Sequence, residues 1–109
     1  MMVLYAKQSD YEYYDSAEAW PSSIGSGWRL PNLDELKIIV NNRVKHNALL
    51  STISGDEIGE NTKYWSSTTF WSTYYVRSGH IRYSYSSGEI KDPKEDFFGN
   101  GVARAVRAL

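Results

Sequence analysis

The ten residues from Gly27 to Leu36, GWRLPNLDEL, carry the clearest structural signal in the chain. Asn32, directly after Pro31, is a favoured N-cap residue. Glu35 follows Asn32 at the spacing of a capping box. Apolar side chains then recur at helical spacing, at Leu33, Leu36, Ile39, Val40 and Val44. The stretch therefore predicts a turn followed by an amphipathic helix that begins after Pro31 and runs to about Arg43.

The residues of this turn are expected to have structural roles. Trp28 and Leu30 flank Arg29, so that two apolar side chains can anchor the entry to the helix. The planar guanidinium of Arg29 can pair with an acid of the first helical turn, Asp34 or Glu35, or with loop carbonyls. A direct role in ligand binding is the alternative for this segment.

Upstream of the turn we expect a strand and a short helix. Val3 to Ala6 is predicted as the strand. Asp15 and Glu18 have the spacing of a capping box, which predicts a helix that continues through Trp20. Pro21 is expected to end this helix, because proline lacks the backbone N–H that a helix interior uses.

Downstream of the long helix, the sequence predicts a loop and then strands. Glycines and acidic residues indicate a loop from Asn47 to Lys63. Aromatic and hydroxyl residues then indicate three strands, with Ser78-Gly79 as the hairpin turn between the last two. These strands are predicted at Tyr64–Thr69, Ser72–Arg77 and His80–Ser86.

The remaining elements complete an α+β pattern. A short strand is expected from Glu89 to Lys91, a polar loop from Asp92 to Asn100, and a last strand from Gly101 to Leu109. Because the predicted helices precede the strands, we expect an α+β fold in which two helices pack on an antiparallel sheet.

The last predicted strand contains two arginines on opposite faces. With strict alternation of side chains, one of Arg104 and Arg107 points toward the interior. A buried cation needs a partner, and Asp34 or Glu35 at the start of the long helix can supply one. A β-bulge would remove the conflict instead.

Length and composition bound the class of protein. The 109 residues are 41% hydrophobic and 23% charged, which suits one globular domain over residues 1–109. A net charge of −1 argues against a general nucleic-acid binder. No apolar run approaches the ~20 residues of a membrane helix, so no membrane insertion is expected. Without a signal peptide, the chain is expected to be cytoplasmic as written, unless it belongs to a larger exported or virion protein.

The sequence carries no catalytic or cofactor signature. Cysteine is absent, which excludes thiol nucleophiles and cysteine-ligated zinc or iron–sulfur sites. His46 and His80 lie in different parts of the chain, and no phosphate-binding loop or nucleophile motif occurs. Asp56, Glu57 and Glu60 are too loosely spaced for a calcium loop. We therefore expect no enzyme activity, no metal and no cofactor.

Half of the aromatic residues lie in one polar segment. Tyr64 to Ser87 holds eight of the sixteen aromatics and ten Ser or Thr. Tyr, Trp and Ser together are typical of binding surfaces, because they combine rigid contact area with adaptable hydrogen bonds. The alternative is that aromatic strand residues form the core, and Trp65 is assigned there. The predicted ligand-binding residues are Trp71, Tyr74, Tyr75, Arg77, His80 and Arg82.

Three motifs in this order resemble a known bacterial domain family. They are Gly27–Pro31 with Glu35-Leu36, then Tyr64–Thr68, then Ala103–Arg107. The family is typified by the C-terminal domain of the Legionella collagen-like adhesin, and the resemblance covers roughly residues 15 to 109. It implies a C-type-lectin-like fold with two helices, a twisted antiparallel sheet and long loops that carry the binding surface. Formylglycine-generating enzymes and the variable proteins of diversity-generating retroelements are similar in fold.

Two properties of such relatives do not carry over. Formylglycine-generating enzymes use a cysteine pair with copper, and this chain has no cysteine. Calcium-dependent lectins place carboxylates and Asn around a proline, whereas Asp92-Pro93 lacks those neighbours.

The expected function is non-enzymatic, calcium-independent recognition of a glycan or protein surface, as in an adhesin. One alternative is a phage or prophage component with a structural or receptor-binding role. Another is a small cytoplasmic protein that binds and blocks a partner protein. The aromatic surface would also suit assembly into a homo-oligomer.

Overall fold

The computed structural model describes residues 2–59, 62–72, 77–83, 85–86, 89–90, 94–96 and 100–109, with side chains in 2–59, 62–69 and 100–109. The helices in these residues are α1 (Tyr14–Ile24), α2 (Leu33–Asn41) and α3 (Arg43–Thr52). The strands are β1 (Met2–Leu4), β2 (Tyr11–Glu12), β3 (Tyr64–Ser72), β4 (Arg77–Tyr83), β5 (Tyr85–Ser86), β6 (Glu89–Ile90), β7 (Lys94–Asp96), β8 (Gly101–Val102) and β9 (Val106–Ala108). The fold is α+β, as predicted, with three helices in place of the expected two.

Helix α2 begins where the sequence predicts. The Asn32 side chain accepts from the backbone N–H of Glu35 (2.8 Å), and the Glu35 carboxylate accepts from the backbone N–H of Asn32 (2.9 Å). This reciprocal pair is the predicted capping box. The helix buries Leu36, Ile39 and Val40 on one face.

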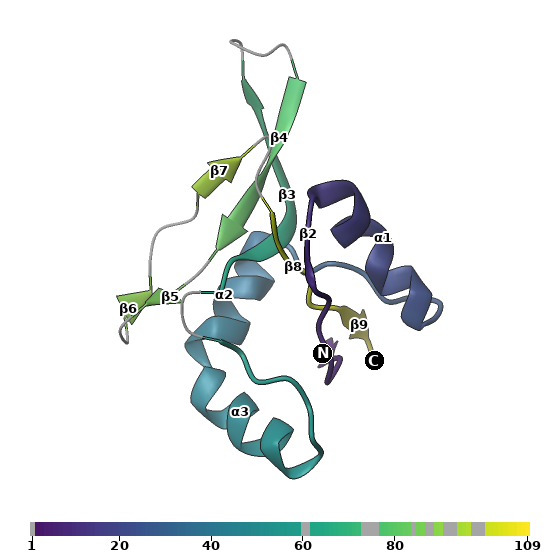
Figure 1. Cartoon of the computed structure of the whole chain (residues 1–109), viewed down its shortest axis with the longest axis vertical. Helices are drawn as coiled ribbons and strands as arrows, with labels where there is room; N and C mark the ends of the chain where they lie inside the picture. The colour runs from purple at the N-terminus through teal and green to yellow at the C-terminus, as the bar shows by residue number, and fades with distance from the viewer. Residues whose placement is uncertain are drawn as a thin grey trace.

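Helix α3 occupies part of the segment predicted as a loop from Asn47 to Lys63. Asn42 separates α2 from α3, and its side-chain amide donates to the carbonyl of Ile38 (2.8 Å). The helix axis changes direction there (Figure 1). The apolar stripe of α2 therefore does not continue to Val44, which is 78% exposed, and α3 buries Leu50 instead.

Helix α1 is longer than predicted, because Pro21 lies inside it and does not end it. Proline costs the helix one backbone hydrogen bond, but its ring is fully buried here and gains packing contacts. The hydroxyls of the two serines that follow donate to the carbonyls of Ala19 and Trp20 (2.7 and 2.6 Å). Asp15 is not the N-cap either, since the helix begins at Tyr14.

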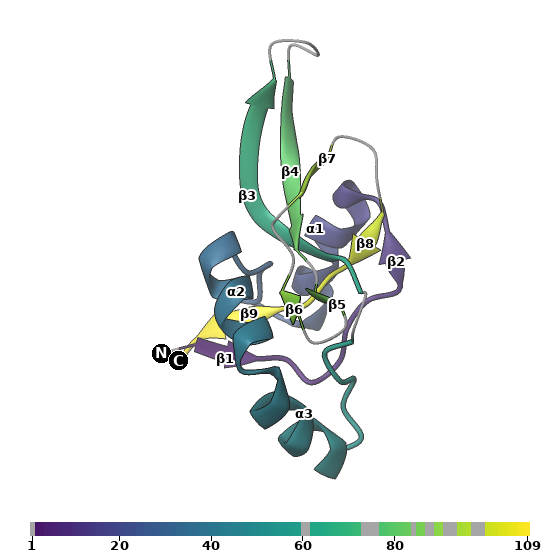
Figure 2. The ribbon, with the colours of Figure 1, turned by 90° about the vertical axis from the view of Figure 1, so that its left-hand side faces the viewer.

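The main sheet has five strands in the order β2–β8–β3–β4–β7. Strands β3 and β4 form a long antiparallel ribbon that extends away from α2 and α3 (Figures 1 and 2). Strand β8 runs parallel to β3, so the sheet is mixed. The prediction of a purely antiparallel sheet is therefore wrong. The pairs β1–β9 and β5–β6 form two further two-stranded sheets.

Ser78-Gly79 does not form the predicted hairpin turn. Both residues lie inside β4, where Ser78 pairs with Trp71 and Gly79 pairs with Phe70. Continuing the ladder through these residues gains backbone hydrogen bonds that a turn at this point would lose. Strand β7 is a similar correction, because it lies within the segment predicted as a polar loop and pairs with β4.

The C-terminal segment forms two strands and not one. Strands β8 and β9 are separated by Ala103–Ala105, whose backbone accepts hydrogen bonds from Tyr5 (2.9 Å) and Ser9 (3.0 Å). Strand β9 then pairs antiparallel with β1, which is the predicted N-terminal strand with shifted bounds. The two ends of the described chain therefore lie side by side (Figures 1 and 2).

Two small cores lie on opposite faces of the sheet. Tyr64 and Trp65 are successive residues of β3, so their side chains point to opposite faces. Helix α2 covers the face of Tyr64, in a core formed by Leu36, Ile39, Val40, Ile58, Tyr64, Val102 and Val106. Helix α1 covers the other face, in a core formed by Ala17, Leu30, Trp65 and Ala103. The expectation that Trp65 belongs to the core is confirmed, because it is 1% exposed.

Candidate functional site

Arg29 joins the turn before α2 to the last strand. Its backbone exchanges two hydrogen bonds with Val106 (3.0 and 2.9 Å). Its guanidinium donates to both carboxylate oxygens of Glu35 (2.7 and 2.8 Å) and to the carbonyl of Leu30 (3.2 Å). The side-chain hydrogen bonds lower the pKa of the Glu35 carboxyl and raise that of Arg29, while partial burial opposes both shifts. The predicted pairing of Arg29 with an acid of the first helical turn is confirmed.

Trp28 is held between two side chains from opposite ends of the chain. The ring of Tyr5 meets it edge-on, with centroids 5.2 Å apart, and Cζ of Arg107 lies 5.1 Å from its centroid in a cation–π contact. Gly27 adopts a φ of 85°, which disfavours any residue with a Cβ. Leu30 is buried beyond this turn. Trp28 and Arg107 therefore hold the turn against the strand pair β1–β9.

Arg104 is the buried arginine that the sequence pattern anticipates, but its partners differ from the prediction. The side chain is 1% exposed and lies in the break between β8 and β9. It donates to the carbonyls of Tyr5 (3.5 Å), Ala6 (3.4 Å) and Asp56, and it also bonds the hydroxyl of Tyr64. Burial lowers its pKa, and the nearby oxygens of Tyr64 and Asp56 oppose that shift.

The predicted pairing of this arginine with Asp34 or Glu35 is therefore wrong. Glu35 is engaged by Arg29, as described above. The backbone turns away between β8 and β9, which directs Arg104 toward the N-terminal segment and the residues after α3.

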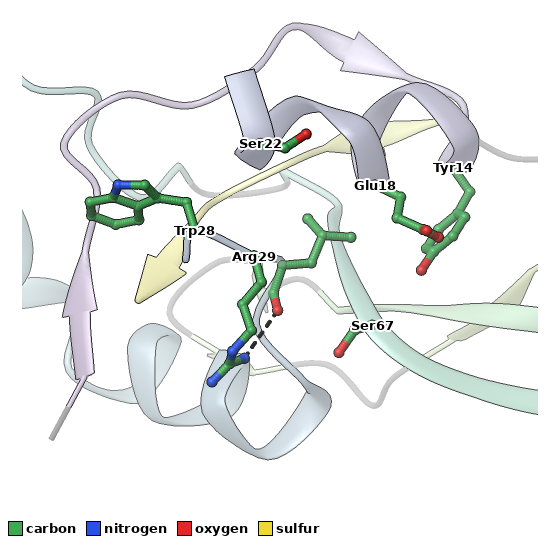
Figure 3. A pocket seen from close by; sticks show the side chains of 7 residues that line it. Tyr14, Glu18, Ser22, Trp28, Arg29 and Ser67 are labelled. Carbon is green, nitrogen blue, oxygen red and sulfur yellow. Dashed lines mark hydrogen bonds between the residues drawn. The ribbon is translucent and has the colours of Figure 1, made fainter. Parts of the chain in front are cut away.

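A hollow of about 340 Å³ lies between α1, the turn before α2, and β3 (Figure 3). Helix α1 contributes one face of side chains four residues apart, and the turn contributes an indole and a guanidinium. Ser67 closes the side formed by β3, where its backbone N–H donates to the carbonyl of Pro31 (2.9 Å). The lining residues are Tyr14, Glu18, Ser22, Trp28, Arg29, Leu30 and Ser67.

Tyr14 and Glu18 form the polar side of this hollow. The ring of Tyr14 packs edge-on against Trp65, with centroids 5.4 Å apart, and this contact fixes its position. Burial raises the pKa of Tyr14, and the hydrogen bond with Glu18 and the charges of Glu18 and Asp15 raise it further. The phenol therefore stays protonated at neutral pH and donates to the carboxylate.

The structure brings together only part of the predicted site. Trp28 and Arg29 line the hollow, whereas Arg104 lies in the interior. Tyr74 and Tyr75 fall outside the described residues. For four further predicted ligand-binding residues the backbone alone is described, in β3 and β4, namely Trp71, Arg77, His80 and Arg82.

Sequence reasoning did not single out Tyr14, Glu18, Ser22 or Ser67 as site residues. One signal in the sequence could have indicated part of this set. Residues 10–18 contain four acids and three tyrosines, with no Lys or Arg. The contribution of Ser67 depends on how β3 meets the turn, which no local pattern encodes.

Within the described residues, no group of three or more His, Asp or Glu is arranged to hold a metal ion. No helix in that part of the chain is both long and apolar enough to cross a membrane. Comparisons of the chain with protein-family models, curated proteins and solved structures find no match.

Proposed function

We propose that this protein is a non-enzymatic module that binds a glycan without calcium. The α+β architecture, in which the three described helices precede the β3–β4 ribbon, supports placing it among the C-type-lectin-like folds. The three ordered motifs support the resemblance to the adhesin domain family. In this proposal, aromatic rings, hydroxyls and a carboxylate at one surface make the contacts.

The hollow beside Glu18 is the observation that carries this proposal. Its volume of about 340 Å³ lies at the lower end of the range for ligand pockets, about 300–1,000 Å³. That size suits one sugar ring. Tyr14 and Trp28 offer aromatic surface for the apolar face of a sugar, and Ser22 and Ser67 offer hydroxyls for its polar edge.

A glycan array tests the proposal. The array includes sulfated glycosaminoglycans, and binding is measured with calcium and with a chelator. We expect saturable binding by the wild-type protein under both conditions. Ser67→Trp is the diagnostic variant, because an indole at this exposed position fills the hollow. It should weaken binding by at least about tenfold.

Thr69→Trp is the matched control. Thr69 is also exposed, lies two residues farther along β3, and does not line the hollow. This variant should bind like the wild type. Loss of binding in the chelator would contradict metal-free recognition. Binding that survives Ser67→Trp would shift the site to the strands, where Tyr75→Ala and Arg82→Ala are the next variants. No binding to any glycan by folded protein would contradict the proposal and favour a protein partner.

A further inference from the structure

The charges in the hollow do not balance. Its two charged side chains are Arg29 and Glu18. Both terminal nitrogens of Arg29 donate to the Glu35 carboxylate, so its positive charge is already offset. Glu18 accepts from the neutral phenol of Tyr14, which leaves its negative charge in place. The hollow therefore presents a net negative charge to a ligand.

The surface on the α1 side of the hollow has the same sign, whereas Arg107 lies over the ring of Trp28 at the side formed by the turn. Residues 10–18 contain four of the thirteen acids in the chain and no Lys or Arg. Asp10 and Asp15 are exposed, and so are the rings of Tyr11 (54%) and Tyr13 (70%). Because the whole chain has a net charge of only −1, this segment is a local concentration of acids. Exposed aromatic rings among carboxylates favour a cation over an anion.

We infer that the hollow binds a saccharide that carries a primary ammonium group, with the ammonium placed on the carboxylate of Glu18. This inference rests on the proposed glycan-binding function and names the class of sugar. An ammonium group donates charge-assisted hydrogen bonds to a carboxylate, which are shorter and stronger than those between neutral groups. Ser22 and Ser67 line the same hollow, where the Ser67 hydroxyl can donate to or accept from the sugar and the Ser22 hydroxyl, which donates to the carbonyl of Ala19, can accept. A sulfated or carboxylated sugar would place its anion against Glu18 at a cost.

Two oligosaccharides that differ only at the amino group, which is free in one and acetylated in the other, test this inference. The probes are a glucosamine tetramer and an N-acetylglucosamine tetramer of the same linkage. Binding is measured by calorimetry at about pH 6, where the amine is protonated. We expect the glucosamine tetramer to bind about tenfold more tightly than its acetylated counterpart. Equal binding, or tighter binding of the acetylated form, overturns the inference.

Glu18→Gln removes the charge at this exposed position and keeps the shape of the side chain. It should weaken binding of the glucosamine tetramer about tenfold and weaken binding of the acetylated tetramer much less, so that the preference for the amine is lost. Glu57→Gln is the matched control, because Glu57 is exposed and does not line the hollow. It should change neither affinity. A Glu18→Gln variant that binds both probes like the wild type overturns the inference.

The outcomes separate this inference from the proposed function. If neutral sugars bind as tightly as the glucosamine tetramer, and Ser67→Trp abolishes their binding, the proposed glycan binding is supported and the preference for an amine is overturned. Failure of every saccharide to bind would remove both. Oligolysine serves as a third probe. If it binds more tightly than the glucosamine tetramer, and Glu18→Gln abolishes that binding, the ligand is a basic peptide and the inference is overturned.

Discussion

The side chain of Arg104 connects its own segment, between β8 and β9, to the backbone of two other segments. Its guanidinium donates to carbonyls in the N-terminal segment, at Tyr5 and Ala6, and in the segment after α3, at Asp56. The residue itself lies between β8 and β9. Carbonyl oxygens buried away from water need donors, and the arginine supplies them to Tyr5 and Asp56. The carbonyl of Ala6 also accepts from the backbone N–H of Asp56 (2.8 Å).

Arg104→Met is expected to lower the free energy of unfolding by about 3 kcal/mol, because it removes this donor from the carbonyls of Tyr5 and Asp56 in the interior. Urea unfolding followed by circular dichroism measures this change. Arg107→Met is the control, since Arg107 is exposed and should cost less than about 1 kcal/mol. A variant of Arg104 as stable as the wild type would contradict the structural role.

His46 makes stability depend on pH. Burial lowers its pKa, and the nearby charge of Arg104 lowers it further. The unfolded chain keeps the ordinary value of about 6.5, so the unfolded state takes up the proton first as the pH falls. Protonation therefore favours unfolding, and stability should decrease between about pH 7 and pH 5.

His46→Gln should reduce that decrease. The test compares urea unfolding of the wild type and the variant at about pH 7.5 and pH 5.5, bracketing the ordinary pKa of histidine. Other groups that titrate in this range affect both proteins equally, so the difference between their slopes isolates His46. Equal slopes would show that the environment of His46 does not perturb its ionisation.

At the scale of elements, the start of α2 is held by two overlapping interactions of Glu35. Its carboxylate accepts from the backbone N–H of Asn32 within the capping box, and it also binds the guanidinium of Arg29. The first interaction caps the N-terminus of the helix, and the second connects this N-terminus to the turn before it. The negative charge at the N-terminus of α2 also suits the helix dipole.

Asn32→Ala should lower the free energy of unfolding by about 1 kcal/mol, because it removes the acceptor for the backbone N–H of Glu35. Thermal or urea unfolding measures the change. Asn41→Ala makes the same substitution at the exposed last residue of α2, where the higher helix propensity of alanine should leave stability equal or slightly raised. Similar losses in both variants would contradict the role of Asn32 as the cap.

At the scale of the whole molecule, the first and last strands of the described chain pair with each other. Strands β1 and β9 pair, and Val106 of β9 also exchanges backbone hydrogen bonds with Arg29. The side chain of Val106 is fully buried in the core under α2. One residue thus joins the last strand to the turn and to the core.

Val106→Ala is expected to lower the free energy of unfolding by about 2 kcal/mol, through lost burial and the cavity left behind. Val44→Ala is the matched control, since Val44 is 78% exposed and its truncation should change stability by less than about 0.5 kcal/mol. Equal effects at the two positions would show that burial of the Val106 side chain contributes little to stability.

Local patterns in the sequence determined the α+β class, the start of α2 and the role of Arg29. A capping box spans three residues, and the pairing of Arg29 with Glu35 spans six. Interactions this short depend on nearby backbone, which the residues themselves specify. The tendency of aromatic strand residues to be buried, together with the position of Trp65 in the Tyr64–Thr68 motif, also indicated Trp65 as core, and it is 1% exposed.

Only the tertiary structure decided the partners of Arg104, the course of the chain through Pro21, and the hollow beside Glu18. The contact of Arg104 with Tyr5 joins residues 99 positions apart, and the hollow needs α1, the turn and β3 to meet. Pro21 stays helical because its buried ring packs against residues that no local pattern names. Such contacts depend on how elements dock, and docking is settled by the burial of apolar surface over the whole chain.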